Sequence, residues 1–297
     1  MKLANKNSVE KICIALGFFD GFHLGHLFLL ERVSSRVVKC RNRVVIAFRE
    51  HPSPSKRPYI LLPSERESLA TLLGWKMFFL PDYFRNFTPE EFLDFLDAMK
   101  PVIVASGEDY RFGKGRAGDV ELLKKRFGNK FFEVPPLYVD GRPVKSSWIK
   151  EEIVKGNIPL ANFLLGYRFF ISGSRVKGSG RGREMGFPTI NIPHPDNKIK
   201  PPYGSYVALL NGVPAVAYFG TSPSVSLKES PVWEAHALDE EGLALIEGSS
   251  SFKIELISFI RREEKFSSVN FLVEAIRSDI SHARSLFKIL SSSSFEK

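Results

Sequence analysis

Two histidines, His23 and His26, share the stretch GFFDGFHLGH (17–26) with three glycines, directly after the apolar run KICIAL (11–16). A strand, a glycine-containing turn and a helix that begins near Gly25 would leave unpaired N–H groups facing an anion, at the positive end of the helix dipole. Imidazole N–H groups there can hold a triphosphate and stabilise the charge that builds on its α-phosphate and on leaving pyrophosphate. The HxGH spacing alone fits a helix start with two satisfied histidines equally well. A metal pair is disfavoured because no third ligand is evident.

Polar residues recur at three later points of the first half, in FREHP (48–52), SGEDYRFGKGRAG (106–118) and VKSSWIK (144–150). A serine pair at a helix start, followed one turn later by a cation, is a pattern for nucleotide phosphates, although the serines would equally cap the helix. The glycines of 106–118 fit GxGxxG, but they do not directly follow a strand and no βαβ unit surrounds them, so we reject a dinucleotide-binding fold there. Arg111 in that stretch can equally be a solvated loop charge.

Three further stretches lie in the second half: GRGREMGFPTINI (180–192), VWEAHALD (232–239) and FIRREEKF (259–266). In the first, glycines allow a loop to approach phosphates closely. Thr189 and Asn191 there offer neutral oxygens of the kind that can bind a magnesium ion carried by ATP. Taken alone, however, FPTIN is a strand-entry turn and Glu234 an exposed strand glutamate.

In this order, these motifs resemble those of the bifunctional riboflavin kinase/FMN adenylyltransferases, the bacterial FAD synthetases. GFFDGFHLGH is similar to GxFDGxHxGH, FREHP to FxPHP, SGEDYRFGKGRAG to VGxDFRFGxxxxG and VKSSWIK to VSSxxIR. GRGREMGFPTINI is similar to GRxxGFPTANI, VWEAHALD to the segment with the catalytic glutamate of the kinase, and FIRREEKF to the terminal FxRxExxF segment. The resemblance runs from about residue 11 to about residue 285.

The resemblance implies two reactions that use ATP and Mg²⁺: riboflavin is phosphorylated to FMN, and FMN is adenylylated to FAD with release of pyrophosphate. It assigns His23 and His26 to adenylyl transfer and Glu234 to the base that accepts the ribityl hydroxyl proton. Further adenylyltransferase ligands for ATP or FMN would be Gly17, Phe18, Asp20, Gly25, His51, Asp109, Arg111, Ser146, Ser147 and Lys150. The kinase would bind ATP and flavin through Gly182, Arg183, Gly186, Pro188, Thr189, Asn191 and Arg261, with Thr189 and Asn191 as the metal ligands.

The chain departs from the family pattern mainly in its second half. Tyr218, Ser222 and Ser224 replace the Asn, Arg and Thr of NxGxRPT, and the usual DLYG is absent. In the first half, Lys150 replaces an arginine and loses its bidentate fork. These departures predict a working but slower kinase. The alternatives are a monofunctional FMN adenylyltransferase with a degenerate, flavin-binding kinase module and, from another class, a basic nucleic-acid-binding protein.

The elements that must position these motifs change character near residue 160. The first half alternates apolar runs at 12–16, 43–48 and 101–106 with helical patterns, which predicts a parallel α/β sheet of Rossmann-like, HxGH type. Capping boxes predict helix starts at Ser64 and at Thr88. Short β-rich runs then predict a mainly antiparallel β-barrel, followed by a long C-terminal helix. We expect an adenylyltransferase domain at 1–158 and a kinase domain at 159–297.

Composition restricts the partners and the compartment. The 297 residues carry a net charge of +9, which favours anionic partners, and phosphate esters such as ATP and FMN satisfy that preference. The basic residues are scattered, so we expect no nucleic acid. Cys13 and Cys40 form no CxxC pair, which suits a reducing cytoplasm better than a disulfide scaffold. No apolar run is long enough to span a membrane. We therefore expect a cytoplasmic enzyme, a monomer or weak homo-oligomer.

Overall fold

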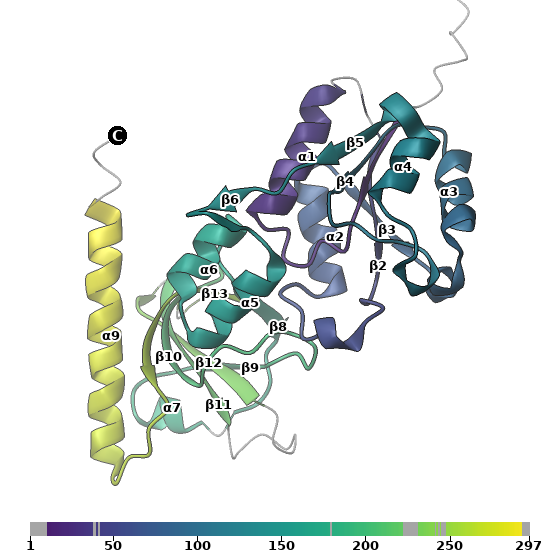
Figure 1. The fold of residues 1–297 in the computed structure, drawn as a ribbon. Coiled ribbons are helices and arrows are strands. Elements are labelled where there is room, and N and C mark those ends of the chain that lie inside the picture. Colours follow the sequence, from purple (N-terminus) through teal and green to yellow (C-terminus); the bar gives the residue numbers. More distant parts are fainter. Residues whose placement is uncertain are drawn as a thin grey trace, which may run out of the picture. The chain divides into compact units, whose positions relative to one another are not determined.

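The computed structural model describes residues 11–37, 40, 42–178, 180–221, 231–240, 242, 244 and 248–292, without the side chains of Pro54 and Arg181. The chain divides into two compact units, Met1–Ser146 and Ser147–Lys297 (Figure 1). The domain boundary that we expect near residue 158 stays a prediction. Each unit is considered by itself below.

The first unit is built on a parallel sheet with the strand order β3-β2-β1-β4-β5. Its strands are β1 (Ile12–Leu16), β2 (Asn42–Phe48), β3 (Lys76–Leu80), β4 (Pro101–Gly107) and β5 (Phe131–Val134). The central strand β1 pairs in parallel with both β2 and β4. Strands are therefore added on both sides of β1, and the strand order reverses direction there. Ligands of such sheets bind beyond the carboxyl ends of the strands at the point of reversal.

Helices connect these strands (Figure 1). They are α1 (Leu24–Arg36), α2 (Pro63–Leu72), α3 (Pro89–Ala98) and α4 (Val120–Phe127), with 3₁₀ turns η1 (Pro54–Lys56), η2 (Asp82–Asn86), η3 (Lys114–Arg116) and η4 (Gly128–Lys130). A short hairpin of β6 (Tyr138–Val139) and β7 (Arg142–Pro143) follows. The predicted parallel α/β fold is confirmed. β3 and β5 are additional strands that we did not predict.

One of the two predicted helix starts is wrong. Thr88 caps α3 and forms a reciprocal capping box with Glu91, as expected. By contrast, α2 begins at Pro63 rather than after Ser64, and Glu65 accepts a hydrogen bond from the backbone N–H of Leu62 at 2.8 Å. Proline at the first helical position needs no backbone donor, so Pro63 sets the start two residues before the predicted Ser64–Glu67 box.

The expectation for the cysteines is also wrong. Cys13 and Cys40 form a disulfide in the structure, although they are 27 residues apart in the sequence. The fold explains their proximity: Cys13 pairs with Arg43 across β1 and β2, and Cys40 precedes β2 by two residues. The absence of a CxxC pattern could not reveal this contact, and the cysteines no longer support a reducing compartment.

The second unit is an antiparallel sheet with the order β8-β13-β10-β11-β12-β9. Its strands are β8 (Phe170–Ser174), β9 (Ile190–Pro193), β10 (Gly204–Leu210), β11 (Val213–Thr221), β12 (Pro231–Ala237) and β13 (Ser251–Arg262). An antiparallel bridge between Val176 and Asn191 joins the two edges, so the sheet nearly closes into the predicted barrel. The helices are α5 (Ser146–Lys155), α6 (Ile158–Leu165), α7 (Arg181–Glu184) and α9 (Val269–Ser292).

Helix α9 packs on one face of this sheet through a small apolar cluster and one buried ion pair. Ile280 and Ala283 of α9 pack with Val207 and Val216 of the sheet. Beside them, Asp279 accepts two hydrogen bonds from the guanidinium of Arg261, at 3.0 and 2.9 Å, and one from the Ser205 hydroxyl at 2.8 Å. This cluster fixes the rotation of α9 about its own axis.

We expect Asp279→Ala to destabilise the second unit by about 2–3 kcal/mol, because Arg261 keeps its charge and loses its partner. The cost is below that of a fully buried pair because the Arg261 side chain is 21% exposed. The measurement is urea unfolding followed by the fluorescence of Trp233, which lies in the barrel core, in a Trp75→Phe, Trp148→Phe background. Glu274→Ala, at an exposed position of the same helix, serves as the control.

Candidate active sites

The loop between β1 and α1 carries the first candidate site, and buried aromatic residues hold it. Phe19, Gly21 and Phe22 have φ angles of 56°, 88° and 40°, so the chain turns sharply there. Phe19 and Phe22 are almost fully buried, which compensates for their uncommon backbone conformation. Gly17 lies against this turn, because a Cβ there would come 2.9 Å from the Phe19 ring. The apolar residues of the motif therefore act as the frame for its polar ones.

His23 and His26 stack on each other at the start of α1, with ring centroids 3.7 Å apart. His23 is the N-cap residue, and its Nδ1 accepts a hydrogen bond from the backbone N–H of His26 at 3.4 Å. Burial lowers the pKa of His23 to about 3 and holds the pKa of His26 well below its usual range. Both rings are therefore neutral at pH 7, and because Nδ1 of His23 is an acceptor, Nε2 carries the hydrogen.

The motif residues around the histidines also hold neighbouring loops. A Cβ at Gly25 would lie 2.9 Å from the carbonyl oxygen of Val144, so only glycine allows this approach. Ser146 donates its hydroxyl to the carbonyl oxygen of Asp20 at 2.8 Å. Oδ1 of Asp20 accepts the backbone N–H groups of Ile60 and Leu61 at 2.8 and 3.2 Å. These contacts place the first and fourth motifs together.

The second motif, FREHP, contacts the first motif, GFFDGFHLGH, through aromatic rings. The ring of His51 meets Phe18 edge-on, with centroids 4.8 Å apart. The backbone N–H of His51 donates to the Tyr59 hydroxyl, and its Nδ1 accepts the backbone N–H of Ser53. Phe18 and His51 are thus brought together as predicted for one site, although their roles toward ATP and FMN stay predictions.

The remaining residues assigned to this site are less closely tied to it. Asp109 is exposed and pairs with Lys145 at 2.8 Å, which raises the pKa of that lysine, and Arg111 donates to the carbonyl oxygen of its neighbour Tyr110 at 3.1 Å. Ser147 and Lys150 lie on α5, in the second compact unit. The ligand contacts assigned to these residues stay predictions.

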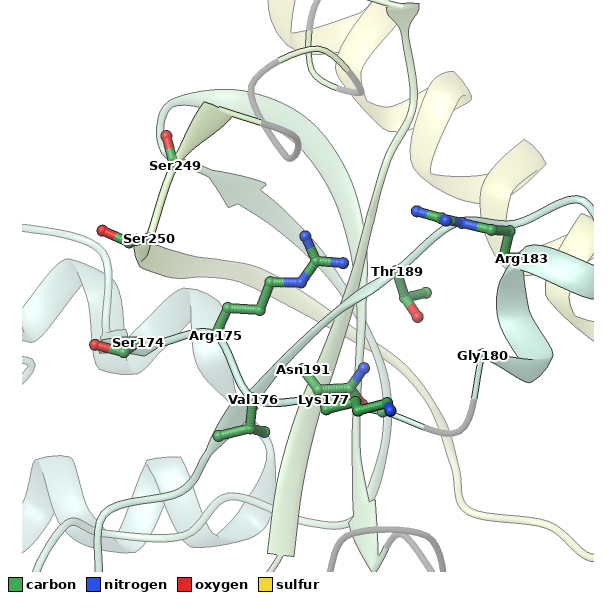
Figure 2. A pocket seen from close by; sticks show the side chains of 11 residues that line it. Ser174, Arg175, Val176, Lys177, Gly180, Arg183, Thr189, Asn191, Ser249 and Ser250 are labelled. Atoms are coloured by element: carbon green, nitrogen blue, oxygen red, sulfur yellow. The ribbon is translucent and has the colours of Figure 1, made fainter.

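A cavity of about 620 Å³ in the second unit holds several of the predicted kinase residues (Figure 2). Arg183, Thr189 and Asn191 line it, as do Arg175 and Lys177, which we did not predict. In Figure 2 the side chains of Arg175 and Arg183 reach toward Thr189 from two sides. Three cations around a hydroxyl and an amide suit a polyphosphate. The basic residues alternating with glycines in SRVKGSGRGR are the signal that could have revealed the two missed cations.

Glycines lie against Thr189 and Asn191, the two predicted magnesium ligands in this cavity. A Cβ at Gly178 would come within 2.3 Å of the amide nitrogen of Asn191. One at Gly182 would come 2.6 Å from the carbonyl oxygen of Phe187 and 3.2 Å from Oγ1 of Thr189. Thr189 and Asn191 are therefore held by close backbone contact, and neutral oxygens of this kind fit a magnesium ion that ATP brings with it.

Strand register places the predicted base beside this cavity. Asn191 of β9 pairs with Glu234 of β12, Glu234 pairs with Tyr218 of β11, and Tyr218 pairs with Ser205 of β10. Directly paired residues project from the same face of a sheet. Together with Arg261, the register partner of Ser205, they form a polar row across five strands.

Two members of this row differ from what the sequence suggested. Tyr218 does more than replace an asparagine: its hydroxyl donates to Glu263 at 2.6 Å, its ring lies over Gly220, and burial raises its pKa. Arg261 directs Nε and Nη2 to Asp279, so its predicted contact with substrate stays a prediction. Ser222 and Ser224 lie outside the described residues.

A second cavity, of about 580 Å³, lies next to His236 of β12. Gly186, Phe187 and Pro188 line it together with His236 and acidic residues that follow β12, and α9 contributes Arg277 and Ile280. His236 follows Glu234 by two residues on the same face of β12, and its Nδ1 hydrogen-bonds the carbonyl oxygen of Pro188 at 2.9 Å. Glu234 is thus two residues from a lining residue of this cavity, and its register partner Asn191 lines the basic one.

Two absences hold for the part of the chain that the structure describes. No group of three or more His, Cys, Asp or Glu side chains is placed to hold a metal ion. No helix there has the length and apolar character needed to cross a membrane.

The neutral histidines predict that acid destabilises the first unit. The pKa of His23 is lowered in the folded state, so below pH 6.5 the unfolded chain binds more protons and stability falls as the pH drops toward 3. Each such histidine contributes up to about 1.4 kcal/mol per pH unit. We expect His23→Gln with His26→Gln to flatten the dependence of the unfolding free energy on pH between 5.5 and 7.

The fluorescence of Trp75, in a Trp148→Phe, Trp233→Phe background, reports the unfolding of the first unit alone, since Trp75 is its only tryptophan. His282→Gln, at an exposed position of α9, is the control and should leave the slope unchanged. An unchanged slope in the double histidine variant would contradict the assigned burial of these rings.

Comparisons with known proteins also divide the chain into two parts. Residues 5–148 match the family model for FAD synthetase, and residues 165–287 match that for riboflavin kinase. The bifunctional riboflavin kinase/FMN adenylyltransferase of Escherichia coli K12 is 30% identical, covering 94% of this chain and 93% of that protein. The Bacillus subtilis protein of the same name is 28% identical, covering 96% and 95%. A crystal structure of a macrolide-efflux protein from Streptococcus pneumoniae has a TM-score of 0.80, with 27% identity, and covers 94% of this chain and 96% of that one. The chain belongs to the family of bifunctional riboflavin kinase/FMN adenylyltransferases.

Proposed function

We propose that this chain makes FAD from riboflavin in two steps, at two separate sites. The kinase site of the second unit transfers the γ-phosphate of ATP to riboflavin, and the first unit transfers the adenylyl group of a second ATP to FMN. The observation that carries the proposal is the pair of stacked, neutral histidines at the end of the central strand. A basic cavity beside Glu234 in the other unit supports the second activity.

The first site suits adenylyl transfer by electrostatic stabilisation. The start of α1 offers unpaired backbone N–H groups, and His23 adds an imidazole N–H at the same place. As the FMN phosphate attacks the α-phosphate, charge grows on that phosphate and on the leaving pyrophosphate. Neutral N–H donors that are already in position stabilise this charge without reorganisation, and no covalent intermediate is required.

The second site suits transfer to an alcohol. Glu234 pairs with Asn191, which lines the basic cavity where we place the triphosphate. It precedes by two residues His236, which lines the cavity where we place the flavin ring. The carboxylate would accept the proton of the ribityl hydroxyl as its oxygen attacks the γ-phosphate, and ADP leaves. The apolar part of this cavity, which includes Phe187, Pro188 and Ile280, offers a surface for a flat organic ring.

Thr189 and Asn191 are the residues that would hold Mg²⁺ in the kinase site. The ion would supply positive charge that neutralises the phosphate oxygens of ATP. Gly178 and Gly182 support this assignment. A Cβ at Gly178 would clash with the Asn191 side chain, and one at Gly182 would clash with the carbonyl oxygen of Phe187 and press on Thr189. The side chains are thus fixed before the nucleotide binds.

The two sites should fail independently when substituted. His23→Ala or His26→Ala removes donors from the triphosphate, so we expect FMN adenylylation to fall by about 100-fold or more while riboflavin phosphorylation continues. Glu234→Gln keeps the shape of the side chain but cannot accept a proton, so the reverse pattern is expected. The measurement is separation of the flavins after incubation with riboflavin or FMN, ATP and Mg²⁺. Equal loss of both reactions in a folded variant would refute the two-site assignment.

The polar row predicts which step is slower. Tyr218 occupies the position next to Glu234, where a ring and a neutral hydroxyl replace the expected amide. We expect this change to slow the kinase but not to abolish it, because Thr189, Asn191 and Glu234 are present. In a time course from riboflavin, FAD should appear with little free FMN. A large transient of FMN would contradict this order of rates, and FAD formed from FMN but not from riboflavin would favour the monofunctional alternative.

A further inference from the structure

Arg66 is a buried arginine of the first unit that the proposed mechanism does not use. It lies on α2, outside the motifs, and its side chain is completely inaccessible to solvent. Burial lowers its pKa to about 10, while the charge of Asp20 favours its protonated form. It therefore remains charged at neutral pH. A buried charge is costly unless it makes strong hydrogen bonds, so its contacts show what the fold gains from it.

The hydrogen bonds of Arg66 join the two strands that carry the first two motifs. Nη1 donates to the carbonyl oxygen of Phe18 at 2.8 Å and to that of Phe48 at 3.2 Å, and Nη2 donates to the carbonyl oxygen of Arg49. Phe18 follows the end of β1, and Phe48 is the last residue of β2. Strand pairing ends at this edge of the sheet, and the guanidinium donates hydrogen bonds to the carbonyl groups there.

Aromatic contacts extend this connection to the side chains of the site. The guanidinium lies 4.4 Å from the centroid of Phe18 and 5.2 Å from that of Phe79. Phe18 in turn meets the ring of His51, and it leads directly into the turn that ends at His23. Arg66 thus contacts the backbone of both motif loops and the ring between them. With no surface exposed, it cannot reach a substrate itself.

We propose that Arg66 is a positioning residue for adenylyl transfer, which fixes the His23–His26 loop relative to the His51 loop across β1 and β2. The inference rests on the proposed role of the histidines. A planar fork with several N–H groups can satisfy carbonyl oxygens from two chain segments at once, which the single ammonium of a lysine cannot do with the same geometry. Displacement of catalytic groups by about 1 Å can cost about 100-fold in rate.

The test compares Arg66→Met and Arg66→Lys with Arg43→Met, an arginine at the opposite end of β2. We expect Arg66→Met to lower kcat for FMN adenylylation at least tenfold and to leave riboflavin phosphorylation within twofold of wild type. Arg66→Lys, which keeps the charge and part of the hydrogen bonding, should recover part of the lost kcat. Arg43→Met should leave both reactions unchanged.

A control for folding separates positioning from simple destabilisation. The fraction of folded first unit at the assay temperature is measured by Trp75 fluorescence in the Trp148→Phe, Trp233→Phe background. A loss of kcat that merely follows the unfolded fraction, or a kcat within twofold of wild type in folded Arg66→Met, would overturn the proposal. His23→Ala is assayed in parallel. If that variant retains full adenylylation, the proposed histidine mechanism fails, whatever the result for Arg66.

Discussion

The carboxyl edge of the parallel sheet imposes the constraint on which the first unit depends. Where β1 and β2 end, backbone groups leave the strand ladder and need new hydrogen-bond partners. Asp20 accepts the N–H groups of Ile60 and Leu61, and Arg66 donates to the carbonyl oxygens of Phe18, Phe48 and Arg49. The side chain of Asp20 thus satisfies backbone donors, and the side chain of Arg66 satisfies backbone acceptors. Helix α1 begins close to Asp20, where Nδ1 of His23 accepts the backbone N–H of His26.

In the second unit, strand register positions the polar residues of the candidate site. Antiparallel pairing repeats one register across β9, β12, β11 and β10, so Asn191, Glu234, Tyr218 and Ser205 project from the same face without any special loop. Asp279 of α9 accepts a hydrogen bond from Ser205 and closes that end of the row. The other end opens into the basic cavity through Asn191. Strand pairing therefore positions Glu234 next to Asn191 at the basic cavity, whereas loops position the residues of the first candidate site.

Sequence patterns predict the parts of this molecule that local chemistry determines. Alternation of strands and helices indicated the parallel sheet, and Thr88 with Glu91 marked the start of α3, because a capping box involves only four neighbouring residues. The HxGH stretch likewise identified the end of β1. Pro63 displaced the expected start at Ser64, since a proline at the first helical position competes with a serine cap. The edge strand β3 was missed, although its neighbour β2 was found.

Contacts between distant segments account for what the sequence could not show. The bond between Cys13 and Cys40 depends on the pairing of β1 with β2, and no spacing rule anticipates it. Arg66 has no motif around it, and its importance is visible only once carbonyl groups from residues 18, 48 and 49 converge on it. Tyr218 could be seen as a departure from a pattern, yet only register shows that it adjoins Glu234. Motifs indicate which chemistry to expect, and the residues that hold the motifs in place emerge from the fold.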